Sequence, residues 1–280
     1  EVKDNPDIVA IKRHFAVDYL QDRNEDRIRQ LSQINPLKNA EMSLEDDYGM
    51  IEEGDRIAVG VSGGKDSLCL LETLAEMRRF YPKKYDVVAI TVDMGFEGAD
   101  FTKLKEFCDS LDVEYKVVDT DIAKIIFDVR KEPNPCSLCA KMRRGSLHLA
   151  ATEAGCNKVA LGHHYDDAVE TFMLNLFFEG RLGCFSPVTY LSRVGIKLIR
   201  PMLYIHERTI DSFVKRQELP VLTNRCPVDK YTKREEIKQL IYDLSATYPD
   251  LRERIFGAMQ RLPLPEWGPQ GRYKRPKDEG

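Results

Sequence analysis

The chain has 280 residues, of which 42% are apolar and 31% charged, and its formal net charge is −4. This length allows one large α/β domain with helical additions. The composition is typical of a folded globular protein, and no apolar run approaches the roughly 20 residues of a membrane-spanning helix. The first residues are charged and lack the apolar stretch of a signal peptide. We therefore expect a cytoplasmic protein without a membrane partner, in which any site for a polyanion is local.

The cysteine count argues against a disulfide scaffold. The chain has seven cysteines, so at least one stays unpaired. A cytoplasmic location also keeps thiols reduced. Metal binding or catalysis therefore explains the cysteines better than disulfide bonding does.

The first 50 residues predict a helical N-terminal segment. Apolar positions such as Ile8, Ile11 and Phe15 recur at helical spacing in a charged background. This segment could cap the core domain or pair with another subunit, so a homodimer stays open.

Residues 51–230 predict the core domain, because short apolar runs alternate with turns and helical stretches. That alternation is typical of an α/β fold with a parallel sheet and helices on both faces. Five strands are expected, at residues 56–61, 86–92, 114–118, 158–161 and 197–199. Helices are expected between and after them, at residues 67–80, 102–111, 143–154, 168–178 and 207–216. Residues 231–262 follow as closing helices, and residues 263–280 as a flexible basic tail.

The first expected strand runs into a helix through a glycine-rich turn, Ser62-Gly63-Gly64-Lys65-Asp66-Ser67. Two glycines let the backbone curl around a phosphate, and a helix N-terminus offers free N–H groups with a favourable dipole. A Walker A loop is excluded, because Gly60 lies one residue too close to Gly64 and Asp66 stands where that motif needs a hydroxyl. An ordinary turn explains neither Lys65 nor Asp66. A carboxylate inside a phosphate loop favours a cation between the two.

This turn resembles the SGGxDS loop of PP-loop ATP pyrophosphatases and matches it at every specified position. Members of that family cleave ATP between the α- and β-phosphates and activate a substrate as its adenylate. The resemblance implies a Rossmann-type sheet of the adenine nucleotide alpha-hydrolase kind. It implies Asp66 as a magnesium partner, and Lys65 and Asp66 as catalytic residues. It further implies ATP phosphate ligands at Ser62, Gly63, Gly64, Lys65 and Ser67.

Two further strands are expected to end in polar residues at the sheet edge where α/β proteins bind ligands. The resemblance puts the nucleoside near Asp93, although a strand-end cap explains that carboxylate equally well. A GHxxDD pattern follows the fourth strand, as in tRNA-modifying PP-loop enzymes, and implies cofactor-binding residues at Gly162, His163, Asp166 and Asp167. Asp167 could share magnesium with Asp66, or the aspartates could cap the helix, and His163 could bond to backbone.

Two thiols, Cys136 and Cys139, stand in a proline-stiffened loop that we expect to precede a helix starting near Lys141. A CxxC pair is ambiguous between zinc, thiol exchange, an iron–sulfur cluster and chance. Cys226 is the candidate third ligand, and Cys184, in a glycine-rich loop, is its substitute. The remaining thiols are expected to be buried hydrophobes, namely Cys69, Cys108 and Cys156.

Together these motifs are similar to those of the tRNA 2-thiocytidine synthetase family. PCSLCxxxRRG, LGHHxDD and Arg200-Pro201 occur in that family's order, over most of residues 50–260. The resemblance implies a 4Fe-4S cluster with one open iron, held by Cys136, Cys139 and Cys226 as catalytic ligands. It implies that ATP adenylates the C2 carbonyl of a tRNA anticodon-loop cytidine and that sulfur delivered through the cluster replaces the oxygen. Sulfide or a cysteine desulfurase would supply the sulfur.

RNA contacts are expected where basic residues adjoin the proposed cluster. Arg143 and Arg144 follow the CxxC pair and could guide a phosphate backbone, and Arg200 is expected near the RNA as part of the family's motif. Three alternatives stay open: action on another tRNA base or a free nucleobase, an amine-adding adenylating ligase, and a zinc-stabilised nucleotide-binding module.

Overall fold

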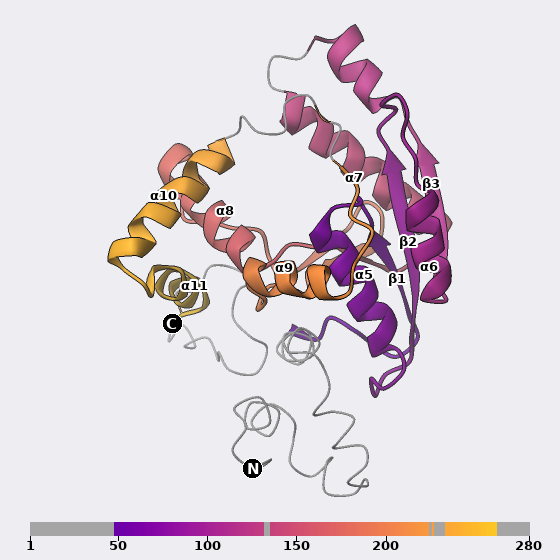
Figure 1. Cartoon of the computed structure of the whole chain (residues 1–280), viewed down its shortest axis with the longest axis horizontal. Coiled ribbons are helices and arrows are strands. Elements are labelled where there is room, and N and C mark those ends of the chain that lie inside the picture. The colour runs from indigo at the N-terminus through magenta and orange to yellow at the C-terminus, as the bar shows by residue number, and fades with distance from the viewer. Residues whose placement is uncertain (1–47, 132–134, 224–225, 227–232, 262–280) are drawn as a thin grey trace, which may run out of the picture.

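A computed structural model describes residues 48–131, 135–223, 226 and 233–261 (Figure 1). The expected N-terminal segment lies outside the described residues except for residues 48–50, and the expected tail 263–280 lies wholly outside them. The described elements are, in chain order, β1 (Asp55–Gly60), α5 (Lys65–Met77), β2 (Tyr85–Asp93), α6 (Thr102–Ser110), β3 (Glu114–Asp119), the π-helix η1 (Lys124–Val129), α7 (Pro135–Glu153), β4 (Lys158–Ala160), α8 (Tyr165–Phe178), β5 (Val188–Leu191), β6 (Ile196–Ile199), α9 (Glu207–Arg216), α10 (Lys233–Thr247) and α11 (Leu251–Arg261).

Within these residues the strands form one six-stranded sheet in the order β3-β2-β1-β4-β6-β5. The pairs β1–β2, β2–β3, β1–β4 and β4–β6 are parallel, and β5 pairs antiparallel with β6 at one edge. The chain moves outward from β1 to β3 and then crosses to the other side of β1. This reversal lies between β1 and β4, and α/β sheets bind ligands at the carboxyl ends of the strands at such a point.

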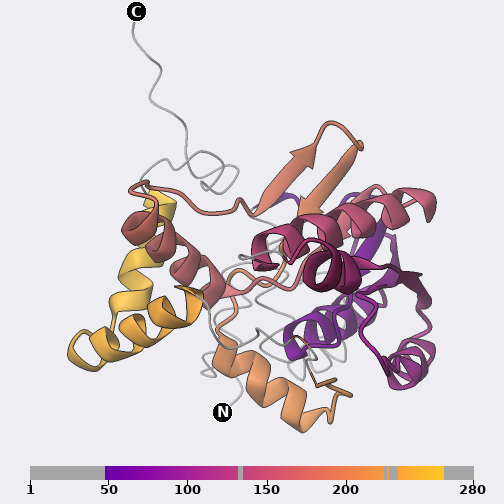
Figure 2. The ribbon, with the colours of Figure 1, turned by 90° about the horizontal axis from the view of Figure 1, so that it is seen from above.

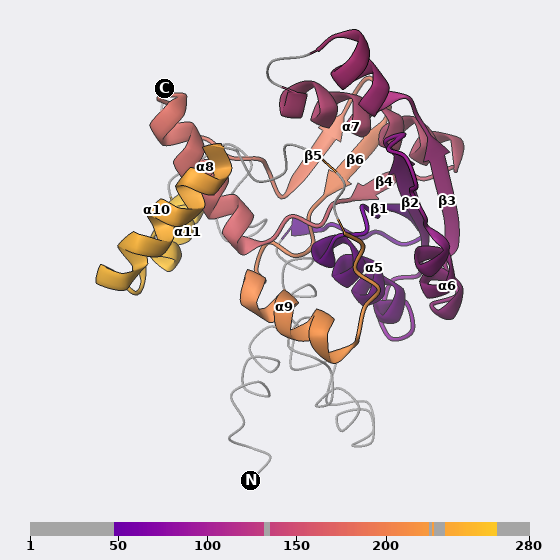
Figure 3. The same cartoon turned by 45° about the horizontal axis from the view of Figure 1, so that its top comes forward.

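The five expected strands are confirmed, but the expected number is wrong because β5 adds a sixth strand. β5 and β6 form a hairpin that projects beside α7 (Figures 2 and 3). Its turn closes through Gly195, which has a φ of 70° and donates its N–H to the Leu191 carbonyl at 2.8 Å. β5 was not predicted because it has only four residues and is only partly buried. A strand of this kind shows neither a long apolar run nor a clear alternation in its sequence.

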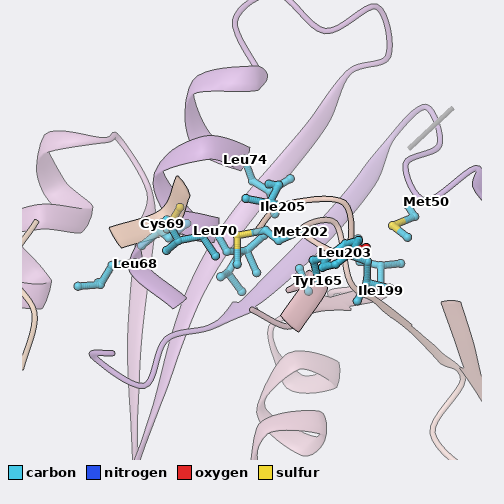
Figure 4. Close-up of a cluster of buried hydrophobic side chains, with 14 of the residues drawn as sticks. Met50, Leu68, Cys69, Leu70, Leu74, Tyr165, Ile199, Met202, Leu203 and Ile205 are labelled. Carbon is cyan, nitrogen blue, oxygen red and sulfur yellow. The ribbon is translucent and has the colours of Figure 1, made fainter. Parts of the chain in front are cut away.

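Helices cover both faces of the sheet, as expected. Ile57 and Val59 of β1 pack in one core cluster with α5 and α6, whereas Ala58, between them, packs in a second cluster with α7. This alternation is the period of two that a strand imposes on its side chains. The larger cluster joins leucines of α5 to Met202 and Ile205, which follow β6 (Figure 4).

The last three helices, α9, α10 and α11, pack on α5 and α8, which begin just after β1 and β4 at the carboxyl edge of the sheet. α9 lies against α5 and buries Ile210 and Phe213, while α10 and α11 pack on α8 (Figure 1). Tyr165, the first residue of α8, stacks on Phe256 of α11 with ring centroids 4.2 Å apart. The start of α8 therefore connects the sheet edge to the C-terminal helices.

Candidate functional site

The glycine-rich turn after β1 has the backbone that its sequence predicts. Gly63 has a φ of 81°, a conformation that favours glycine. A side chain there would also meet Leu222, whose Cδ1 would lie 2.9 Å from the added Cβ. The Leu222 N–H donates to the Gly63 carbonyl at 2.9 Å. Leu222, four residues before Cys226, therefore contacts the phosphate loop directly.

The two serines of the loop bond to the loop itself. Ser67 donates its hydroxyl to the Gly64 carbonyl at 2.9 Å and accepts the Ser62 N–H at 3.1 Å, and the two hydroxyls lie 3.2 Å apart. Gly64 is the N-cap of α5, and no side chain caps that helix end. The first turn of α5 therefore keeps N–H groups that can bind an anion.

Lys65, expected at the phosphates, is bound to two carboxylates of α9. Its Nζ lies 2.7 Å from Glu207 Oε1 and 2.6 Å from Asp211 Oδ1. Burial lowers the pKa of Lys65, but its hydrogen bonds to Asp211 and Glu207 outweigh this, so the net pKa lies above its ordinary value. Lys238 of α10 lies 2.9 Å from Glu207 Oε2. Burial raises the pKa of Glu207, and the two lysines outweigh that effect and bring it down to about 2.

One carboxylate oxygen of Asp66 lacks a hydrogen-bond donor. Its Oδ1 is buried and has no hydrogen-bond partner among the described residues. Burial raises the pKa of Asp66 above its ordinary value, and the nearby Asp167 adds to that effect. Gly162 permits this arrangement, because a Cβ there would lie 3.1 Å from the Asp66 carbonyl carbon and 3.2 Å from the Ser67 nitrogen. A buried carboxylate oxygen without a donor fits a cation ligand such as magnesium.

The two aspartates at the start of α8 have different surroundings. Asp167 closes a capping box with His164, and its Oδ1 accepts from Arg234 Nη1 at 2.7 Å. Asp166 is buried, and it accepts from Arg252 Nη1 at 2.6 Å and from the Glu207 N–H at 2.8 Å. Both of its oxygens thus connect α8 to α9 and α11. Asp167 also uses both oxygens, since its Oδ2 accepts the His164 N–H at 3.0 Å. Asp167 interacts electrostatically with Asp66, so it stays the second magnesium candidate.

His163 and Arg200 form a second polar group with Phe185. The rings of His163 and Phe185 lie 4.7 Å apart, and the Arg200 guanidinium lies 5.0 Å from the Phe185 ring centroid. Burial, helped by the charge of Arg200, lowers the pKa of His163 to about 4, so its ring is neutral at neutral pH. His163 Nδ1 and Arg200 Nε are buried and lack hydrogen-bond partners in the described part of the chain.

Arg200 does not lie on the surface where an RNA backbone would contact it. It is 7% exposed, and its Nη1 donates to the Ser186 carbonyl and, at 3.3 Å, to Thr189 Oγ1. Burial lowers the pKa of Arg200 to about 10. Arg200 directly follows β6, which places its side chain inside the domain. The expected contact of Arg200 with RNA stays a prediction.

Asp93 lies at the carboxyl end of β2, in the position expected for a nucleoside contact. Its Oδ1 accepts the Gly95 N–H at 2.9 Å, and its carbonyl accepts from Thr120 Oγ1 at 2.6 Å. The side chain therefore serves as a strand-end cap here. A contact between the nucleoside and the second carboxylate oxygen of Asp93 stays a prediction.

The CxxC pair lies in a helix rather than in a loop. α7 begins at Pro135, so Cys136 lies in its first turn and Cys139 about one turn later, and the expected start near Lys141 is wrong. Proline is well tolerated at the first position of a helix, and the apolar periodicity that marks α7 begins only later. Arg143 and Arg144 follow on the same helix and are exposed, as expected for contacts to a polyanion.

The three candidate thiols share one neighbourhood. Cys139 interacts electrostatically with both Cys226 and Cys136. Burial raises the pKa of Cys139, Arg143 opposes this, and the two thiols raise it further. None of the seven cysteines forms a disulfide bond. Cys69, Cys108 and Cys156 are buried, as expected. Cys184 donates to the Ala168 carbonyl at 3.4 Å, and burial raises its pKa to about 12, which disfavours the thiolate that a metal needs.

Three cysteines are suitable ligands for an iron–sulfur cluster, although Cys136, Cys139 and Cys226 are not arranged around a common point. Among the described residues, no three His, Cys, Asp or Glu side chains are arranged to hold a metal ion. Cys136 is exposed at the helix start and Cys139 half-buried one turn later, so both can be approached from the same side. Thiolates are the usual ligands of iron–sulfur clusters, and a helix N-terminus favours their negative charge.

Comparison with known proteins shows the family. Residues 31–244 match the PP-loop domain family. The tRNA-cytidine(32) 2-sulfurtransferase of Syntrophotalea carbinolica is 40% identical, covering 76% of this chain and 83% of that protein. The protein of the same name from Geobacter sulfurreducens is 38% identical, covering 80% of this chain and 88% of the relative. The chain belongs to this sulfurtransferase family. It is therefore an enzyme, and family membership favours sulfur transfer over an amine-adding ligase or a non-catalytic module.

A solved structure agrees with the fold of this sulfurtransferase. The U34-tRNA thiolase NcsA from Methanococcus maripaludis, solved with its [4Fe-4S] cluster, is 26% identical, with a TM-score of 0.65 over 78% of this chain and 75% of that one. In the described part of the sulfurtransferase, no helix has the length and apolarity to cross a membrane.

The sequence did not predict the charged residues that α9 and α10 bring to the site. These residues are Glu207, Asp211, Arg234 and Lys238, and each lies within 3.2 Å of a charged partner there. They stand on amphipathic helices among many other charges, so no motif distinguishes them. Only the packing of α9 and α10 against α5 and α8 reveals them.

Proposed function

We propose that this sulfurtransferase uses ATP to replace the C2 oxygen of a tRNA cytidine with sulfur, at cytidine 32 of the anticodon loop. Support for the base comes from relatives named tRNA-cytidine(32) 2-sulfurtransferase, which this chain matches over most of their length. The observation that carries the proposal is that Cys226 interacts electrostatically with Cys139 of the CxxC pair and stands four residues after Leu222, whose N–H donates to the Gly63 carbonyl of the phosphate loop.

Activation of the cytidine is assigned to the phosphate loop and its carboxylates. The free N–H groups at the start of α5 would bind the pyrophosphate half of ATP. Asp66 and Asp167 would hold magnesium, which would offset the negative charge of the phosphates. Asp93 would lie near the nucleoside. The cytidine O2 then attacks the α-phosphorus, pyrophosphate leaves, and the base carries AMP on its former carbonyl oxygen.

The three thiols are assigned to a 4Fe-4S cluster. When bound, a cluster held by three cysteines supplies one iron that can bind sulfur. Cys136 and Cys139, at the start of α7, would hold it together with Cys226, and Cys184 would take no part. Displacement of AMP by sulfur completes the exchange, because AMP departs with the original oxygen. Sulfide, or a cysteine desulfurase, would supply the sulfur.

The tRNA is assigned to the exposed start of α7. Arg143 and Arg144 lie one turn after Cys139 and are exposed, so they can bind the phosphate backbone beside the thiols. Arg200 and His163 lie inside the domain, where they would position the activated base rather than contact the backbone. The neutral His163 ring and the Phe185 ring give this position two flat surfaces on which a base can stack.

The test is the stoichiometry of the products under anaerobic conditions. Iron-loaded protein, ATP, magnesium, sulfide and unmodified tRNA are incubated, and AMP, pyrophosphate and thiolated nucleoside are counted. The proposal predicts one AMP and one pyrophosphate for each thiolated nucleoside, and no ADP. AMP formation without thiolation, together with transfer of an amine, would establish the ligase alternative. Zinc in place of iron in anaerobically purified protein would favour the zinc-stabilised module.

A further inference from the structure

Arg234, in the first turn of α10, reaches the start of α8, which carries the candidate magnesium ligand Asp167. Its Nη1 donates to Asp167 Oδ1 and its Nη2 to Thr171 Oγ1, both at 2.7 Å. The side chain stays 42% exposed, so it has room to move. It stands eight residues after Cys226 and in no recognised motif.

The surroundings of Arg234 are acidic and lead to the phosphate loop. Asp167 lies 3.5 Å from His164 Nε2, which in turn lies 3.9 Å from the unpartnered Oδ1 of Asp66. Glu170, one turn along α8, is buried, and it interacts electrostatically with both Arg234 and Asp167. The guanidinium therefore offsets negative charge that magnesium would offset in a nucleotide complex.

Magnesium and the guanidinium cannot both bind the same oxygen of Asp167 favourably, because two cations at that distance repel each other. If magnesium takes Asp167, the hydroxyl of Thr171 alone holds Arg234. The planar fork of arginine suits the oxygens of a phosphate, and magnesium bound at Asp167 would bring the phosphates of ATP with it.

We propose that Arg234 exchanges partners when ATP binds: it occupies the cation position on Asp167 in the nucleotide-free enzyme and binds phosphate oxygens in the magnesium–ATP complex. This inference rests on the proposed role of Asp167 as a magnesium ligand. It gives the enzyme a way to couple nucleotide binding to the position of α10.

The test is two binding measurements on Arg234→Gln without tRNA. The first titrates Mn²⁺ into nucleotide-free protein and follows free Mn²⁺ by electron paramagnetic resonance. The variant should bind Mn²⁺ about fivefold more tightly, because a competing charge is gone. The second titrates ATP with magnesium by calorimetry, and the variant should bind ATP about tenfold more weakly, because a charge-assisted phosphate contact is lost.

Two further variants act as controls. Lys233→Gln removes the neighbouring positive charge, which pairs with Glu236 at 2.8 Å, and should change each affinity by less than about twofold. Arg234→Lys keeps the charge and should keep Mn²⁺ affinity within about twofold of the unaltered protein. Circular dichroism verifies that each variant is folded.

The proposal requires both changes. Mn²⁺ affinity that stays the same or falls in Arg234→Gln would show that the arginine does not occupy a cation position, and unchanged ATP affinity would show that it does not reach the phosphates. Either result overturns the exchange. Neither result bears on thiolation itself, which is measured with tRNA, so failure here is distinct from failure of the proposed function.

Discussion

The Lys65 ammonium lies 2.7 Å from a carboxylate oxygen of Glu207 at the start of α9. Asp211 holds the same ammonium at 2.6 Å. Phosphates must therefore compete with two carboxylates of α9 for the one lysine of the loop. The lysine thus links nucleotide binding to the position of α9.

Lys65→Ala is expected to lower ATP-to-AMP turnover by at least about 100-fold, because it removes a charge that stabilises the pyrophosphate as it leaves. Its counterpart, Asp211→Asn, removes a competitor and should tighten ATP binding about two- to fivefold, the range for a partly exposed ion pair. Turnover is measured by AMP release with tRNA, and binding by calorimetry. An unaltered rate of AMP release in Lys65→Ala would show that the lysine only pairs with the carboxylates of α9 and takes no part in ATP cleavage.

Cys136→Ala, Cys139→Ala and Cys226→Ala should each lose iron and the visible absorption of the cluster, because a cluster with one open iron cannot spare a further ligand. Cys69→Ala and Cys108→Ala are the controls, since both side chains are buried in the core. Iron content and absorption are measured after anaerobic reconstitution. Loss of iron in Cys184→Ala, with iron kept in Cys226→Ala, would move the third ligand to Cys184.

Gly162→Ala should destabilise the protein by about 1–3 kcal/mol and weaken ATP binding, since a methyl group would press on the start of α5. Its Cβ would meet the Asp66 carbonyl oxygen at 3.1 Å. Gly145→Ala is the matched control: nothing lies within 4 Å of its Cβ, and it stands inside α7. That change should stabilise the helix by about 0.5–1 kcal/mol. Thermal unfolding measures both, and equal effects would contradict the close approach at Gly162.

Glu170→Gln should stabilise the protein at pH 8 and leave it nearly unchanged at pH 5. Burial raises the pKa of Glu170 from 4.5 to about 7, with Asp167 adding to the effect against Arg234 and Lys238. A raised carboxyl pKa gives stability that is fully present below pH 4.5 and is lost as pH rises through about 7. The gain at pH 8 should be on the order of 2 kcal/mol. Denaturant unfolding at the two pH values measures it, and an equal gain at both would assign the effect to packing.

The sequence predicted the parts of the site that depend on local backbone. The glycines around Lys65, the strand before them and the helix after them follow from local rules, and all are present. The start of α7 was misplaced, because its first turn has polar and thiol side chains instead of an apolar period. The partners of Lys65 and Asp167 could not be predicted, since Glu207 and Arg234 reach them only through the packing of distant helices.

The most direct test of the central claim is to locate the sulfur in the tRNA. Iron-loaded and iron-stripped protein are each incubated anaerobically with ATP, magnesium, sulfide and unmodified tRNA, and nuclease fragments are sequenced by mass. The proposed function predicts 2-thiocytidine at position 32, only with iron-loaded protein, and none in a tRNA whose cytidine 32 is replaced by uridine. Sulfur on a uridine would contradict the assignment of the base, and equal thiolation by the iron-stripped protein would contradict the assignment of Cys136, Cys139 and Cys226 to a cluster.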